Sequence, residues 1–330
     1  MNAGCEPEFP PWLRPPLERL LGLSAEGQLP SGLLLTGPFG VGKGVLARAF
    51  LQRVACTRAD DALLPCGNCN GCHAFLGGIH PEILEVTPEE VGKEILIEAV
   101  RGITDFLSLS HSGPARLVLI EPAEAMTVNA ANALLRTLEE PPAGAMIVLA
   151  ATRSARLPAT IRSRCRLLRV PPPPVATVRA WLGDCHGSGM AVDEALAASL
   201  NRPLGALELI RDAAAVENWR QDREALVSLL TQDTPFPTVT AFRQCDLKSL
   251  IPRLQCLLLS AHYYLATGLH NDFGRLFDRR VLEAFARRLG RHELAQLSLE
   301  SLRWQREADA PLNPELRCES MVLRLTNGNA

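Results

Sequence analysis

The first half of the chain alternates short, almost uninterrupted apolar runs with segments whose apolar residues recur at helical spacing. Runs without polar alternation are typical of parallel strands buried on both faces, and the segments between them fit the helical crossovers that such strands require. The pattern therefore predicts an α/β fold built on a five-stranded parallel sheet. The predicted strands are 33–36, 83–86, 116–121, 146–151 and 166–170, and the clearest helices between them are 45–50, 95–109 and 129–140.

The second half of the chain has helical periodicity throughout. It begins at a run of four prolines, 171–174, which can form neither a helix nor a central strand and acts as a stiff spacer. We therefore predict three domains: a sheet domain over 1–170, a small helical domain over 171–213 and an all-helical domain over 214–330. The helices predicted after the prolines are 175–184, 191–199, 204–214, 219–230, 247–266, 273–289, 293–304 and 314–325.

Composition narrows the functional classes only slightly. The formal net charge of −2 argues against a protein that coats nucleic acid, although a local basic patch stays compatible with DNA contact. The N-terminus lacks the apolar core of a secretion signal, and no apolar run approaches the roughly 20 residues of a membrane span. We therefore expect a soluble cytoplasmic protein without membrane contact, whose ten cysteines are free thiols or metal ligands rather than disulfides.

Four of these cysteines fall in one short window. Cys56, Cys66, Cys69 and Cys72 have the spacing C-x9-C-x2-C-x2-C, and two intervening glycines allow the tight turns that bring neighbouring thiolates together. Four thiolates fit a closed, tetrahedral structural Zn²⁺ site. Such a site has no open position for chemistry, so we expect it to stabilise the fold rather than to catalyse. Small buried cysteines without a metal are the alternative.

The segment 37–44, G-P-F-G-V-G-K-G, resembles a phosphate-binding loop with one part missing. The pattern G-x-x-x-x-G-K-[ST] is met at Gly37, Gly42 and Lys43, with Gly40 as a further loop glycine. It fails at the last position, because Gly44 replaces the Ser or Thr whose hydroxyl holds Mg²⁺. The loop follows a predicted strand and precedes a predicted helix, as such loops do. The sequence thus predicts a degenerate nucleotide site, in which ATP or ADP binding without hydrolysis stays open.

The acidic residues that hydrolysis needs are also incomplete. An ATPase of this architecture carries one carboxylate for the metal and one for the attacking water at the end of its third strand. Glu121 occupies the first position, but Pro122 occupies the second and cannot activate water. Loss of the hydroxyl and of this carboxylate should slow hydrolysis by about 10³-fold or more.

Three motifs support a family resemblance that covers almost the whole chain. N-A-L-L-R-T-L-E-E-P-P at 132–142, S-R-C at 163–165 and the cysteine module inserted after the loop helix resemble those of bacterial clamp-loader subunits, a family of AAA+ proteins. The degenerate loop resembles the delta-prime branch of DNA polymerase III more than the ATP-hydrolysing gamma/tau branch. The resemblance implies an AAA+ sheet domain with a zinc module near 56–72, a helical lid domain over 171–213 and a helical collar domain over 214–330 that supports oligomerisation.

The resemblance also implies a role. The chain would be a non-hydrolysing stator in a hetero-pentameric ring with gamma/tau and delta subunits, and would help to load the sliding clamp on primed DNA. It would itself be catalytically inactive, although part of a DNA-directed DNA polymerase (nucleotidyltransferase) holoenzyme. Arg164 of S-R-C would reach a neighbour's ATP as an arginine finger, because a guanidinium supplies fixed charge and forked donors to the γ-phosphate.

The resemblance also points to two further basic residues, and two alternative functions stay open. Arg101 and Arg136 fall near the DNA-facing positions of the family, where they would contact backbone phosphates without reading sequence. Ordinary charge on a helix surface is the equal alternative for each. Contact with the sliding clamp would be weak or indirect. An active gamma/tau-like ATPase with an atypical loop is the main alternative, and the missing hydroxyl and carboxylate argue against it. A zinc-dependent nucleic-acid reader is weaker, because the cysteine window lacks interleaved basic or aromatic residues.

Overall fold

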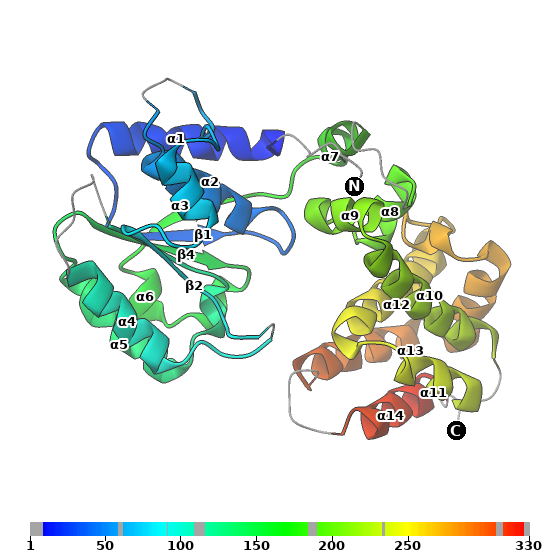
Figure 1. Ribbon diagram of the computed structural model, residues 1–330. Coiled ribbons are helices and arrows are strands. Elements are labelled where there is room, and N and C mark those ends of the chain that lie inside the picture. The colour runs from blue at the N-terminus through cyan, green and yellow to red at the C-terminus, as the bar shows by residue number, and fades with distance from the viewer. Residues whose placement is uncertain are drawn as a thin grey trace. The chain divides into compact units, whose positions relative to one another are not determined.

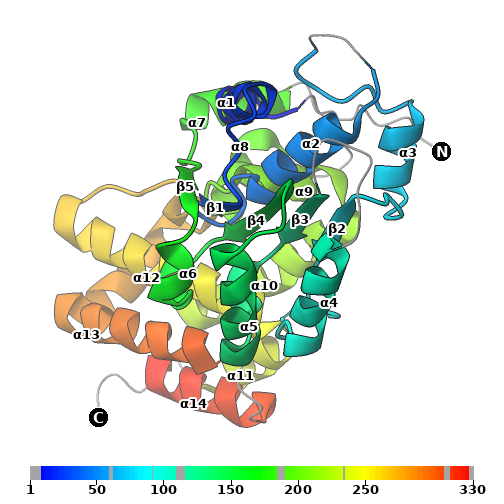
Figure 2. The same cartoon turned by 90° about the vertical axis from the view of Figure 1, so that its left-hand side faces the viewer.

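The computed structural model describes residues 9–58, 62–90, 92–108, 116–183, 190–232, 235–307 and 313–326. These residues form two compact units, one over Pro7–Trp181 and one over Leu182–Ala330, and each is described by itself below. Figures 1 and 2 label most of their helices and strands.

The N-terminal unit is built on a five-stranded sheet in the order β2-β3-β4-β1-β5, with every neighbouring pair parallel. β1 lies between β4 and β5. Because all the strands are parallel, the loop that follows β1 leaves from the carboxyl edge of the sheet, where parallel sheets bind ligands. The sequence prediction of a five-stranded parallel sheet is confirmed. The strands are β1 (Gly32–Thr36), β2 (Ile83–Val86), β3 (Arg116–Ile120), β4 (Ala145–Ala151) and β5 (Arg166–Arg169).

Helices cover both faces of this sheet, as Figures 1 and 2 show. Because successive side chains of a strand point to opposite faces, Leu33 and Leu35 pack into one hydrophobic core and Leu34 into the other. The first core is covered by η1 (Pro11–Leu13), α1 (Arg14–Ala25), α2 (Lys43–Ala55) and α3 (Asn70–Leu76). The second is covered by α4 (Ile97–Ser108), η2 (Ala123–Ala125), α5 (Val128–Glu139) and α6 (Ala159–Arg162). The short η3 (Ser154–Arg156) follows β4, and α7 (Val175–Gly183) follows the prolines.

The C-terminal unit contains only helices among the residues that the structure describes. Most bury an apolar stripe, and the aromatic side chains of Trp219 on α10 and Phe242 on α11 are buried. The helices predicted at 273–289 and 293–304 are one interrupted element, which bends where Gly290 adopts a φ of 70°. The elements are α8 (Val192–Ala198), α9 (Pro203–Arg211), α10 (Ala213–Thr231), α11 (Pro235–Arg243), α12 (Leu247–Thr267), η4 (Gly274–Leu276), α13 (Arg279–Glu307) and α14 (Pro314–Thr326).

One ion pair is buried in this helical unit. Asp222 of α10 is 1% exposed and pairs with Arg253 of α12, while Ser249 donates its hydroxyl to the same carboxylate at 2.8 Å. The Arg253 guanidinium also stacks over the Trp219 ring, 5.0 Å from its centroid. Burial raises the pKa of Asp222, and the arginine acts in the opposite direction. The pair therefore fixes how α10 and α12 meet, because separating its members would leave a charge without water.

No helix in the described parts of the chain is long and apolar enough to cross a membrane. The further division of the helical half at residue 213 stays a prediction.

Candidate functional site

The lysine of the loop after β1 forms its hydrogen bonds within the loop itself. Gly40 and Gly42 have φ of 78° and 98°, a backbone conformation that L side chains rarely adopt, and Lys43 begins α2 directly after them. The ammonium of Lys43 donates to the carbonyl oxygens of Gly37 at 3.0 Å and Pro38 at 2.8 Å. Burial lowers the pKa of Lys43, while the charges of Glu124 and Glu121 act to raise it. The lysine thus holds the loop closed on itself.

The N-terminal segment packs directly on this loop. The indole Nε1 of Trp12 donates to the carbonyl oxygen of Val41 at 2.9 Å, and the ring meets Trp181 edge-on with centroids 5.0 Å apart. Leu13 is fully buried, and a Cβ added to Gly42 would overlap its side chain. Both contacts tie η1 to the backbone of the phosphate loop.

Gly44 lies against the carboxylate of Glu121. A Cβ added to Gly44 would overlap both carboxylate oxygens, so the space of the expected hydroxyl side chain is already filled. Arg48, one turn further along α2, donates from Nη1 to Glu121 at 2.8 Å and from Nε to Glu85 at 2.9 Å. These three residues form what we call the Arg48 cluster, which consists of Arg48, Glu85 and Glu121.

Pro122 stands at the position where a carboxylate that activates water is expected from the sequence. Pro122 directly follows Glu121 and precedes η2. The next acidic residue, Glu124, accepts the backbone N–H groups of Thr152 at 2.9 Å and Arg153 at 3.0 Å through one oxygen. Glu124 therefore links the end of β3 to the end of β4.

The four cysteines of the predicted metal site come together. Cys66 and Cys69 lie 3.6 and 3.8 Å from Cys56, and Cys66 lies 3.9 Å from Cys72, measured between sulfur atoms. All four sulfurs lie within 4.8 Å of one another. A tetrahedron with Zn–S bonds of about 2.3 Å has sulfurs about 3.8 Å apart, so the cluster has the dimensions of a zinc site. The same distances exclude disulfides, whose sulfurs are about 2 Å apart.

Local packing holds this cluster in place. Cys69 caps α3 by accepting the N–H of Cys72 at 3.4 Å, and Gly71 lies so close to the carbonyl oxygen of Ala55 that a Cβ would overlap it. Hydrogen bonds from Thr57 and from the Cys72 backbone lower the pKa of Cys69 to about 5, whereas burial raises the pKa of Cys72 to about 12. The C-terminal end of α2 and the N-terminal end of α3 therefore meet at residues that can bind a metal ion.

Arg164 follows α6 and is held by an intramolecular ion pair. Its Nη2 lies 2.6 Å from Oε1 of Glu139, and its Nη1 donates to the carbonyl oxygen of Thr160 at 2.9 Å. Both side chains are partly exposed, 35% for Arg164 and 48% for Glu139. The S-R-C and E-E-P-P motifs are thus joined in space, since each supplies one partner of this pair.

Comparison with known proteins defines the family. The family model described as "DNA polymerase III, delta subunit" matches residues 15–174. The chain is 36% identical to DNA polymerase III subunit delta' of Escherichia coli (strain K12), over 68% of this chain and 66% of the relative. It is 34% identical to the delta' subunit of Yersinia pestis, over 74% of this chain and 70% of the relative. The chain belongs to the DNA polymerase III delta' family. It spans about two thirds of the length of these relatives.

A solved structure gives the same fold for this delta' family member. A DNA polymerase III gamma-subunit-related protein from Thermotoga maritima superimposes with a TM-score of 0.51 at 18% identity, covering 93% of this chain and 98% of the other. At this identity the likeness shows the fold alone, and it supports the AAA+ architecture predicted from the motifs.

The two arginines predicted to contact DNA lie on neighbouring helices of the N-terminal unit. Arg101 is on α4 and Arg136 on α5, and both are exposed. The two helices cover the same face of the sheet and are joined by a hydrogen bond of 3.2 Å between the hydroxyls of Thr104 and Thr137. A contact between either arginine and DNA stays a prediction.

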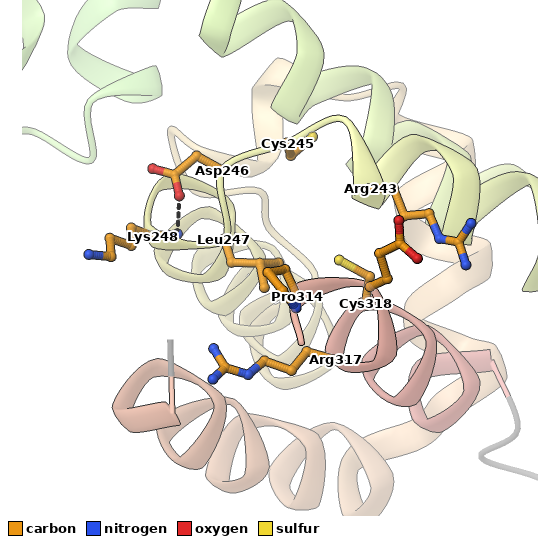
Figure 3. Close-up of a pocket in the computed structure, with 9 residues that line it drawn as sticks. Arg243, Cys245, Asp246, Leu247, Lys248, Pro314, Arg317 and Cys318 are labelled. Carbon is orange, nitrogen blue, oxygen red and sulfur yellow. Dashed lines mark hydrogen bonds between the residues drawn. The ribbon is translucent and has the colours of Figure 1, made fainter. Parts of the chain in front are cut away.

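A separate pocket lies in the helical unit (Figure 3). Charged side chains of both signs surround it, and Arg243 pairs with Glu319 beside it. Asp246, which lines the pocket, caps the N-terminus of α12 by accepting the backbone N–H of Lys248 at 3.1 Å. The pocket shares no residue with the loop, the cysteine cluster or Arg164. It is lined by Arg243, Cys245, Asp246, Leu247, Lys248, Pro314, Glu315, Arg317 and Cys318.

Sequence reasoning missed two members of the Arg48 cluster. Arg48 lies four residues after Gly44, which puts both on one face of α2. Glu85 is on β2, whose neighbour in the sheet is β3, the strand that leads to Glu121. The signal was therefore present in helical spacing and strand order, but it becomes visible only once the order of the strands is known.

Proposed function

We propose that this chain is a non-hydrolysing subunit of the DNA polymerase III clamp loader. In this role it takes a place in a hetero-pentameric ring with gamma/tau and delta subunits, acts as the stator, and supplies Arg164 to the ATP site of an adjacent subunit. The ring loads the sliding clamp on primed DNA during replication in the cytoplasm. Family membership supports the complex, and the degenerate loop supports the stator role.

The observation that carries the proposal is the state of the phosphate loop. Gly44 has no hydroxyl for a metal, Pro122 has no carboxylate for a water, and the Glu121 side chain fills the space beside Gly44. In-line attack on a phosphate requires a positioned metal and an oriented water, and neither has its usual ligand here. The gamma/tau-like ATPase alternative needs both groups, and it is therefore disfavoured.

Reconstitution tests the proposed place in the complex. Gamma/tau and delta subunits of the same organism, mixed with sliding clamp, primed DNA and ATP, should load clamps only when this chain is added. A chain that neither co-elutes with these subunits nor stimulates loading would contradict membership of the ring. A denatured aliquot of the same preparation is the control.

The isolated chain should not turn over ATP. We expect hydrolysis at the background rate with Mg²⁺ and primed DNA present, because two groups of the hydrolytic machinery are missing. Lys43→Ala should then leave clamp loading by the reconstituted ring within about twofold of the unchanged chain. Turnover at a rate typical of enzymes that Lys43→Ala abolishes would instead support the gamma/tau-like alternative.

Further parts of the proposal concern ligands. The cluster of Cys56, Cys66, Cys69 and Cys72 would hold a structural Zn²⁺, supported by its sulfur spacing. ATP or ADP would be at most a structural ligand of the loop residues Gly37, Gly40, Gly42 and Lys43. Arg101 and Arg136 would contact the phosphates of primed-template DNA, and contact with the sliding clamp would be weak or indirect. The zinc, lid and collar divisions of the chain are proposed on the same resemblance.

A further inference from the structure

The loop after β1 does not fit a nucleotide that carries Mg²⁺. The protein ligands that Mg²⁺ ordinarily has in such a site are a hydroxyl at position 44, which is absent here, and a carboxylate after β3 that is free to face the metal. The Glu121 carboxylate instead occupies the space that a side chain at position 44 would need, and it is bound by Arg48. The place of a divalent cation is thus bordered by a cation that the chain supplies itself.

We propose that Arg48 replaces the divalent cation of an AAA+ site, and that the Arg48 cluster closes this end of the loop to Mg²⁺. The inference concerns the loop alone and holds or fails independently of the stator role. It states more than a loss of hydrolysis, because it assigns a positive role to a residue outside the loop motif.

The geometry links the two departures from the loop pattern. Glu121 has one methylene more than the aspartate that ATPases carry at this position, so its carboxylate can reach across to α2. It can rest there only because Gly44 has no side chain. A serine or threonine at position 44 and a glutamate at position 121 would compete for one space, so the glycine makes this position of the Glu121 carboxylate possible.

Arg48 neutralises two carboxylates that come from neighbouring strands. β2 and β3 are parallel neighbours, with Glu85 opposite Leu119 in the register, so Glu85 and Glu121 emerge on the same edge of the sheet. One guanidinium bonds both carboxylates through different nitrogens, at 2.9 and 2.8 Å. Such a fork suits planar guanidinium geometry, and arginine keeps its proton at any physiological pH. The positive charge of Arg48 is therefore present beside the loop at every physiological pH.

Arg48→Ala tests the proposal directly. Removal of the guanidinium should leave Glu85 and Glu121 without their bound cation, and carboxylates placed together attract hard divalent ions. We expect Mn²⁺ affinity, measured by electron paramagnetic resonance, to rise at least about tenfold over the unchanged chain. The gain should disappear in Arg48→Ala/Glu121→Gln. Arg19→Ala, which removes an exposed arginine of α1, is the matched control and should gain nothing.

A second variant keeps the proposal testable if Arg48→Ala does not fold. Gly44→Ser must push the flexible end of Glu121 away from Arg48, so it should melt about 2 °C below Gly102→Ser, a serine placed in α4 where an added Cβ meets nothing within 4 Å. Shortening the acid in Gly44→Ser/Glu121→Asp should recover most of that difference. A melting temperature of Gly44→Ser equal to that of Gly102→Ser would overturn the proposal. So would Mn²⁺ binding by the unchanged chain that Glu121→Gln removes, or a folded Arg48→Ala that gains no Mn²⁺.

Discussion

Rings reconstituted with Arg164→Ala should lose ATP hydrolysis at one neighbouring site by about 10³-fold or more, the scale on which arginine fingers act. The variant chain should fold normally, because Arg164 is partly exposed and its ion pair with Glu139 is a surface pair of small net value. The ring should also assemble, because its assembly is proposed to depend on the helical unit. The measurement is DNA-stimulated ATP turnover with the other sites of the ring inactivated one at a time.

Two further variants separate charge from geometry. Arg164→Lys should not restore turnover, since an ammonium lacks the planar fork that spans two phosphate oxygens. Glu139→Gln should keep turnover within about threefold, because it removes only the intramolecular partner of the arginine. Normal turnover at the adjacent site with Arg164→Ala in place would reduce Arg164 to a surface residue, and the trans-acting role would have to be withdrawn.

Protein purified without added metal should contain about one zinc per chain, and its removal should destabilise the N-terminal unit. The four sulfurs lie between the ends of α2 and α3, so an empty site would leave thiolates facing one another. Cys69→Ser should abolish zinc retention and lower the melting temperature by on the order of 10 °C. Elemental analysis and thermal denaturation with and without a chelator measure both effects.

Cys256→Ser is the matched control for the zinc experiment. Cys256 is a half-buried cysteine of α12 outside the cluster, so its substitution should leave the zinc content at one per chain. A folded protein free of metal, or a Cys69→Ser chain that retains zinc, would contradict the assignment. Clamp loading by whatever Cys69→Ser protein stays folded should be nearly normal, because a saturated site performs no chemistry.

The strands were predictable because parallel strands buried on both faces must be apolar at every position. β2 was predicted with its observed bounds, and the other four strands to within one residue at either end. Helices with a weak or interrupted apolar stripe were not found from periodicity, among them α1 and α11. α11 begins Pro-Phe-Pro, which reads as a turn, and its fold depends on Thr238 and Phe242 packing into the helical core.

The candidate site was predictable only where residues close in sequence carry it. The loop motif and the cysteine window are each contiguous, so their spacing already indicates phosphate and zinc geometry. The Arg48 cluster joins α2, β2 and the end of β3, and the pairing of Arg164 with Glu139 joins two motifs 25 positions apart. Such long-range pairs are set by strand order and helix packing, which local patterns do not contain.

Glu124 links two strand ends at the carboxyl edge of the sheet. Its carboxylate holds the backbone of Thr152 and Arg153, so the end of β3 and the end of β4 are fastened together through one side chain. The segment beyond Arg153 leads through η3 and α6 to Arg164 with few residues to spare. The hydrogen bonds of Glu124 thus connect the end of β3 to the segment that carries Arg164.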